Sequence, residues 1–192
     1  MRKIIAGLVL GLIIGSMAFG QTGISLYPGG HLLMEYRITS DQKAFTYAIE
    51  LIPQGDGTYL VRTEAIGPAS LEELASDVPL LFMWSPTLWL TSGWWVAPYM
   101  MISMMYGLAV EPHKTYVLPG GATYVTEETI EIAGVQAVKG TITAPDQPGE
   151  RTILALAPDP RVPYPVWVRQ ERQVGEAWEV EFEMILTDYQ HG

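Results

Sequence analysis

The segment AWEVEFEMILTDY, residues 177–189, carries the clearest pattern in this 192-residue sequence. Its apolar side chains recur at every second position, and Glu179, Glu181 and Glu183 occupy positions between them. Successive side chains of a strand point to opposite faces of a sheet, so this alternation predicts a strand with one buried and one solvated face. The side chains predicted to be buried are Trp178, Val180, Phe182, Met184 and Leu186.

The same alternation appears before and after this segment. Residues 31–39 and 43–52 alternate, and the turn sequence GDG at residues 55–57 separates the second from residues 58–66. Glycine and proline clusters divide the remaining strand-like segments, which are residues 113–119, 122–133, 135–144, 151–158 and 164–174. The expected fold is mainly β: a curved antiparallel meander of about nine strands, forming an unclosed half-barrel.

A helical insertion is expected from about residue 70 to residue 110. The sequence SLEE at residues 70–73 is a capping box and predicts a short helix to about residue 77. Serine-proline at residues 85–86 and Pro98 are typical helix starts, whereas Gly93 and Gly107 are typical helix stops. The insertion is predicted to lie against the concave face of the sheet.

Residues 78–110 contain no charged side chain. Their predicted helical pieces are about 10 to 14 Å long, too short for a hydrocarbon core of about 30 Å, so no transmembrane span is predicted. A helix that is apolar all round must be buried or covered by a partner or lipid. Methionine adapts to apolar partners of different shape. The candidate contacts for a hydrophobic ligand are Trp84, Trp89, Trp94, Trp95, Tyr99, Met100, Met101, Met104 and Met105.

The N-terminal residues have the composition of a cleaved secretory signal. Arg2 and Lys3 precede an apolar run, and small residues at Ala18 and Gly20 mark a processing site before Gln21. We therefore expect residues 1–20 to be removed, leaving residues 21–192 as one β-rich domain exported to the periplasm or the medium. The sequence contains no cysteine, so neither a lipid anchor nor a disulfide is expected.

Charge limits the partners of this domain. The sequence has a formal net charge of −10, and loss of Arg2 and Lys3 with the leader would make it −12. Nucleic acids and anionic lipid headgroups are poor partners for such a surface.

Catalytic motifs are not evident. His31, His113 and His191 are too scattered to show a metal motif and are interpreted as solvated, and no G-x-S-x-G or P-loop sequence occurs. Glu127 and Glu128 are expected to point to opposite faces of one strand, while Glu72 and Glu73 belong to the capping box. Neither a metal nor a cofactor is expected, and the protein is predicted not to be an enzyme. A hydrolase using carboxylates dispersed in the sequence is the alternative.

Several segments resemble known bacterial proteins. YPGGHLLMEYRIT at residues 27–39, GDGTYLVRTEA at residues 55–65, and the segments IEIAGVQAVKGTI, VPYPVWVRQ and FEMILTDY are similar to uncharacterised secreted β-proteins. The order of strands, helical insertion and further strands also resembles the lipoprotein-carrier (LolA/LolB-like) superfamily. That resemblance implies an unclosed antiparallel barrel whose concavity, covered by short helices, takes up acyl chains. No functional residue is carried over from it.

Two functional hypotheses follow. The first is non-enzymatic binding of an acyl chain, lipid or lipidated partner, with the Trp/Met-rich insertion as a lid. The second is a structural or interaction module whose insertion docks on another envelope protein or on a membrane surface.

Overall fold

The computed structural model describes residues 27–40, 43–67, 96–106 and 110–192. Nine antiparallel strands form one unclosed sheet, with a single α-helix in this described part, so the predicted fold class is confirmed. The strands are β1 (Leu32–Ser40), β2 (Lys43–Pro53), β3 (Tyr59–Ile66), β4 (Thr115–Val117), β5 (Thr123–Ile132), β6 (Val135–Thr143), β7 (Glu150–Leu156), β8 (Trp167–Val174) and β9 (Ala177–His191). A 3-10 turn, η1 (Pro119–Gly121), separates β4 from β5.

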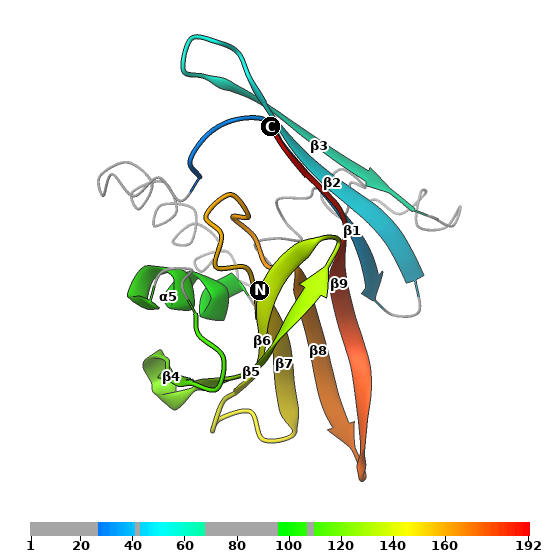
Figure 1. Ribbon diagram of the computed structural model, residues 1–192. Coiled ribbons are helices and arrows are strands. Elements are labelled where there is room, and N and C mark those ends of the chain that lie inside the picture. The colour runs from blue at the N-terminus through cyan, green and yellow to red at the C-terminus, as the bar shows by residue number, and fades with distance from the viewer. Residues whose placement is uncertain (1–26, 41–42, 68–95, 107–109) are drawn as a thin grey trace, which may run out of the picture.

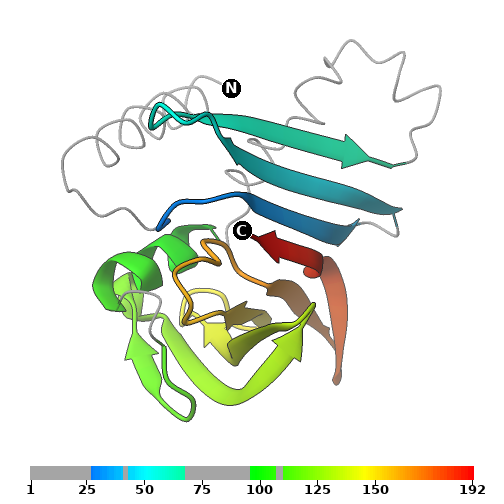
Figure 2. The same ribbon diagram turned by 45° about the horizontal axis from the view of Figure 1, so that its top comes forward.

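The strand order is β3-β2-β1-β9-β8-β7-β6-β5-β4. The sheet therefore consists of two meanders, which the pairing of the first strand with the last one joins. This pairing places β3 and β4 at the two edges of the sheet, although they follow one another in the chain. Residues 67–114 thus connect one edge of the sheet to the other. Figures 1 and 2 show how the sheet curls between these edges.

Two irregularities bend β9, the longest strand. The register with β1 shifts between Glu35 and Tyr36, and the register with β8 shifts between Gln170 and Glu171. Such bulges bend a strand and increase its twist. Because β1 pairs with residues 182–191 and β8 with residues 177–185 of β9, the two meanders are also offset along this strand.

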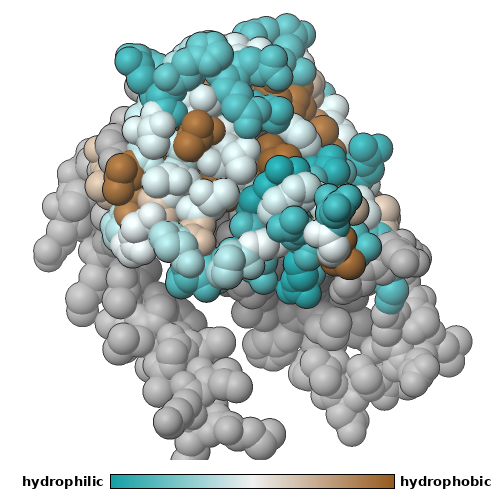
Figure 3. Space-filling model, turned by 90° about the horizontal axis from the view of Figure 1, so that it is seen from below, coloured by the Kyte–Doolittle hydropathy of each residue, from teal (hydrophilic) through white to brown (hydrophobic). Residues whose placement is uncertain are grey.

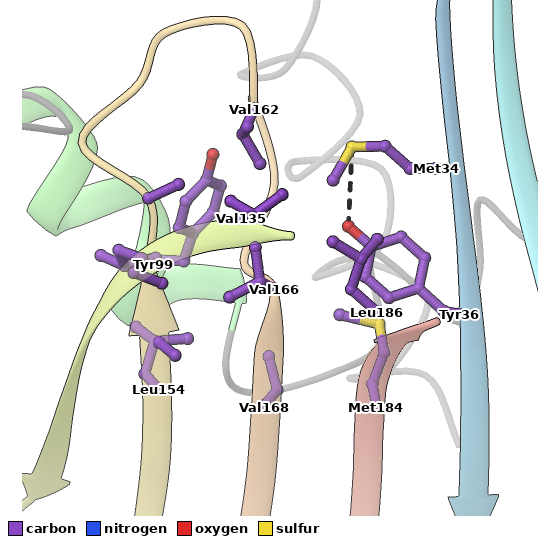
Figure 4. Packing of buried hydrophobic residues seen from close by; sticks show 14 of the residues in the cluster. Met34, Tyr36, Tyr99, Val135, Leu154, Val162, Val166, Val168, Met184 and Leu186 are labelled. Atoms are coloured by element: carbon purple, nitrogen blue, oxygen red, sulfur yellow. Dashed lines mark hydrogen bonds between the residues drawn. The ribbon is translucent and has the colours of Figure 1, made fainter. Parts of the chain in front are cut away.

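The buried core lies on the concave face. Leu32, Met34, Tyr36 and Ile38 are buried as their alternation predicted. Figure 4 shows Tyr36 beside Met184 and Leu186, and Leu154 and Val168 extending the same layer across the sheet. Burial of such side chains is the main favourable contribution to folding.

Two tyrosine hydroxyls in this core donate hydrogen bonds to backbone carbonyls. Tyr36 is fully buried, and its hydroxyl donates to the carbonyl of Pro165 at 3.1 Å. Tyr124 is also fully buried, and its hydroxyl donates to the carbonyl of Leu154 at 3.1 Å. Burial raises the pKa of both phenols, so both remain neutral donors at physiological pH.

The burial predicted for the first half of β9 is wrong. Met184 and Leu186 are buried, but Trp178 and Val180 are 36% and 45% exposed. The bulge opposite Glu171 interrupts the alternation, so Trp178 lies on the outer face, where the guanidinium of Arg151 lies 4.0 Å from the centre of a Trp178 ring.

One predicted helix is confirmed. The structure has α5 (Val96–Tyr106), which begins two residues before the predicted start at Pro98. Proline is tolerated in the first turn because no intrahelical partner awaits its missing N–H. The helices predicted at residues 70–77 and 86–92, like the leader at residues 1–20, lie outside the described residues. Within the described residues, no helix is both long and apolar enough to cross a membrane.

Candidate functional site

Helix α5 carries those candidate ligand contacts that the structure can place. Tyr99 is buried, Met101 is partly buried against the core, and Met105 is 52% exposed. Met100 and Met104 belong to the same helix, but their side chains lie outside the described part of the structure. Trp84, Trp89, Trp94 and Trp95 also lie outside it.

Tyr99 fixes α5 to the loop that precedes β8. Its ring points among Val135, Leu154 and Val166 (Figure 4), and its hydroxyl donates to the carbonyl of Pro163. Burial raises the pKa of Tyr99 to about 12, so the hydroxyl keeps its proton at physiological pH. One of the predicted contact residues is therefore part of the protein's own core.

Ile102 and Ser103, which were not among the predicted contact residues, also face the core. Ile102 is fully buried, whereas Ser103 is 7% exposed and its hydroxyl donates to the carbonyl of Tyr99 at 2.9 Å. Because Met105 on the same helix is largely exposed, α5 has one buried side and one apolar surface that reaches solvent. The buried and the exposed sides of α5 could not be told apart from the sequence, because apolar residues occur on all sides of the helix.

A polar pair interrupts the apolar concave face. Thr152 of β7 and Gln170 of β8 face one another in the sheet, and they are 0% and 7% exposed. Neither Thr152 Oγ1 nor Gln170 Nε2 has a hydrogen-bond partner among the described residues. Most buried polar groups in proteins are paired, so two neighbouring unpaired donors require an explanation. This pair was not predicted from the sequence, although Thr152 and Gln170 occupy the same alternate, inward-facing positions as Leu154 and Val168.

The outer face is polar and carries cross-strand ion pairs. The carboxylate of Glu171 is 4% exposed and lies between two arginines, at 2.6 Å from Arg151 Nε and 2.8 Å from Arg169 Nε. Seen from below in Figure 3, the described surface is mostly hydrophilic with separate hydrophobic patches. Such cross-strand pairs are typical of a solvated sheet face.

The expectation that Glu127 and Glu128 point apart is wrong. The register of β5 with β6 shifts between Thr126 and Thr129, so both glutamates lie opposite Lys139. The Lys139 ammonium is 2.8 Å from a Glu127 oxygen and 4.0 Å from a Glu128 oxygen. A hydrogen bond from Lys139 and another from Thr141 hold the pKa of Glu127 below its usual value, which disfavours a role as proton donor at neutral pH.

We expect replacement of Lys139 to restore an ordinary titration of Glu127. In Lys139→Met, the pKa of Glu127 should rise because the hydrogen bond that contributes most to its lowering is lost. A folded pKa below the unfolded one contributes stability above the unfolded pKa, and this contribution disappears as the pH falls through the folded pKa. The variant should therefore lose less stability than the unmodified protein as the pH falls from about 5 to below the folded pKa of Glu127. Carboxyl NMR titration measures the pKa of Glu127. Lys114→Met, which removes a 3.6 Å ion pair between Lys114 and Glu111, is the control and should leave the pKa of Glu127 unchanged.

Two of the histidines differ from their predicted solvated state. His31 and His191 are half-buried at neighbouring ends of β1 and β9, whereas His113 is exposed as expected. His31 Nε2 lies 3.0 Å from a Glu50 oxygen, and His191 Nε2 lies 3.1 Å from the carbonyl of Gly29. Within the described residues, no group of three or more acidic or histidine side chains is placed to hold a metal ion.

The comparisons with known proteins give a loose structural likeness. No protein-family model matches the sequence, and no curated protein matches it significantly. Solved structures that are similar include the crystal structure of MucB, at 13% identity and a TM-score of 0.39, covering 85% of this chain and 54% of that one. The complex of MucA and MucB from Pseudomonas aeruginosa is similar at 15% identity and a TM-score of 0.40, covering 85% and 52%. The chain thus spans about half the length of these MucB chains, and the likeness concerns β architecture alone.

Proposed function

We propose that this protein is a non-enzymatic binding protein for an acyl chain or a similar lipid with one polar end. The supporting observation is the buried, unpartnered pair of Thr152 Oγ1 and Gln170 Nε2 on an otherwise apolar concave face. Apolar side chains suit a hydrocarbon tail, and two adjacent donors suit a single carboxylate or ester group. Export to the cell envelope or the medium, without a lipid anchor, forms part of this proposal.

The ligand-bound state requires some rearrangement of the present packing. Leu154 and Val168, the inward neighbours of the polar pair, are fully buried. A tail that contacts them replaces contacts that they make now. Helix α5 is the element proposed to move, because its described contacts with the core are made by side chains, Tyr99, Ile102 and Ser103 among them, and not by strand pairing.

The test removes the polar atoms while keeping the side-chain shapes. We expect Thr152→Val and Gln170→Leu to fold normally, because replacing unpaired buried polar groups with apolar ones is nearly neutral or stabilising. Both should bind a fluorescent fatty acid more weakly, by about tenfold or more each, because a hydrogen bond to a charged head group is lost. Thr141→Val, on the outer face, is the matched control and should bind normally.

Two outcomes would count against this proposal. Failure of the unmodified protein to take up the fatty acid would reject acyl binding. Uptake with the same affinity in both variants and the control would reject Thr152 and Gln170 as the polar anchor.

A second candidate function rests on Met105, which exposes an apolar surface of α5 to solvent. In that case α5 would dock on another envelope protein or on a membrane surface. Met105→Asp should then reduce co-sedimentation with neutral phospholipid vesicles and leave fatty-acid uptake unchanged. Equal co-sedimentation of the two proteins would exclude the membrane version.

A further inference from the structure

Strand β3 forms an eight-residue edge of the sheet. It pairs with β2 over residues 59–66, and no other described strand pairs with its second side. Figures 1 and 2 show it at the outer limit of the sheet. A strand in this position presents a row of unpaired backbone N–H and C=O groups that can pair with another chain.

Both faces of β3 expose apolar side chains. Leu60 and Val61 are 54% and 59% exposed and, as consecutive residues, point to opposite faces of the sheet. Ile66 is 62% exposed on the same face as Leu60. Exposed apolar side chains on a free edge favour pairing with another strand, since pairing buries them.

Strand β3 lacks two of the usual protections of an edge strand. Residues 59–66 contain no proline, and the register with β2 is continuous, without a bulge; the charged side chains of this strand are Arg62 and Glu64. The opposite edge differs, because β4 has three residues and ends at the η1 turn. The two edges of the sheet are therefore unequal, and β3 is the one able to accept a partner along a full strand.

We propose that β3 pairs with β3 of a second copy of this chain, antiparallel and with Thr63 on the two-fold axis. Alternating faces restrict the register, since residues of odd number must oppose residues of odd number to keep each face continuous. Cross-strand charge pairs then favour one of the permitted registers over others. Centring on Arg62 or on Glu64 places like charges directly opposite, whereas centring on Thr63 places Arg62 opposite Glu64 twice.

The apolar residues agree with this register. Leu60 then opposes Ile66 on one face, and Val61 opposes Ala65 on the other. Arg62 and Glu64 are 65% and 50% exposed; within one chain Arg62 lies 3.5 Å from Glu64 and 3.8 Å from Glu50, and the exposure of both side chains lets them reach a partner strand as well. Because the charged and the apolar residues of β3 both complement those of a second β3 at the same centre, the proposed occupant is a second copy of this chain. This inference does not depend on the proposed ligand.

Cysteine cross-linking tests the register without background, because the chain has no cysteine of its own. Opposed residues of antiparallel strands have Cα atoms about 4.5 to 5.5 Å apart, within the range for a disulfide. Thr63→Cys should therefore form a disulfide-linked dimer under mild oxidation. Val61→Cys and Ala65→Cys should each stay monomeric alone and form a linked dimer when mixed. A monomeric Thr63→Cys protein, or equal cross-linking at all three positions, would overturn the proposal.

Charge exchange gives an independent measurement on the cysteine-free protein. Sedimentation equilibrium should show a concentration-dependent dimer, and Arg62→Glu or Glu64→Arg should weaken it by about tenfold, because two attractive pairs become repulsive. The double variant Arg62→Glu/Glu64→Arg should recover most of the affinity. Glu176→Arg, the same charge change at the exposed turn between β8 and β9, is the control and should dimerise normally. A monomer at all concentrations, or single variants with unchanged affinity, would contradict β3 pairing.

Discussion

Replacing Gly140 with alanine should destabilise the protein by about 1–3 kcal/mol and lower its melting temperature by several degrees. A Cβ atom at Gly140 would lie 2.6 Å from a ring carbon of Tyr124, 2.6 Å from the carbonyl oxygen of Val125 and 2.9 Å from the Cα of Thr126. Two of these atoms belong to the backbone of β5, so no side-chain rotation relieves the contact. The Tyr124 ring is itself held by its hydrogen bond to the carbonyl of Leu154.

A loss of stability at Gly140 would be opposite in sign to the usual effect of replacing glycine with alanine. Where space allows, a change from glycine to alanine stabilises a protein by about 0.4–1 kcal/mol, because it restricts the unfolded chain. Gly192→Ala is the control, since a Cβ at Gly192 meets no atom within 4 Å. Thermal unfolding of both variants measures the difference. An unchanged or higher melting temperature for Gly140→Ala would contradict the packing of Tyr124 against β6.

Replacing Ile102 with alanine should cost about 2–5 kcal/mol of stability. Ile102 is fully buried in the core cluster, so its truncation removes apolar contacts and leaves a cavity between α5 and the sheet. Met105→Ala in the same helix should change stability by no more than about 0.5 kcal/mol, because Met105 is 52% exposed.

This pair of variants tests how α5 is attached to the sheet. Denaturant unfolding gives both free energies, and the comparison uses one helix and one kind of truncation. Equal losses for Ile102→Ala and Met105→Ala would show that α5 does not rest on the core through Ile102. If the proposed ligand binds beneath α5, Ile102→Ala should also change fatty-acid uptake, whereas Met105→Ala should not.

The strands could be predicted from the sequence because burial on one face imposes a period of two. Each of the nine predicted segments overlaps an observed strand, although the segment at residues 113–119 contributes only Thr115–Val117. The order of the strands in the sheet could not be predicted. The pairing of β1 with β9 joins residues about 150 positions apart, and no local pattern encodes such a contact.

Bulges explain the side chains whose direction was predicted wrongly. One extra residue in β9 moves Trp178 to the outer face, and one extra residue in β5 brings Glu127 and Glu128 to the same lysine. Alternation cannot show where a bulge interrupts it. The polar pair of Thr152 and Gln170 could not be predicted for another reason. A single polar residue among the buried positions of a strand leaves the two-residue period of that strand unchanged. The four tryptophans proposed as ligand contacts lie outside the described residues, and their role stays a prediction.

Native mass spectrometry of the exported protein, purified without detergent and followed by lipid extraction, tests the proposed function most directly. Acyl binding predicts one co-purifying lipid or fatty acid per chain in the unmodified protein. It also predicts much lower occupancy in Thr152→Val/Gln170→Leu than in Thr141→Val. A folded protein that carries no lipid after export would contradict acyl binding.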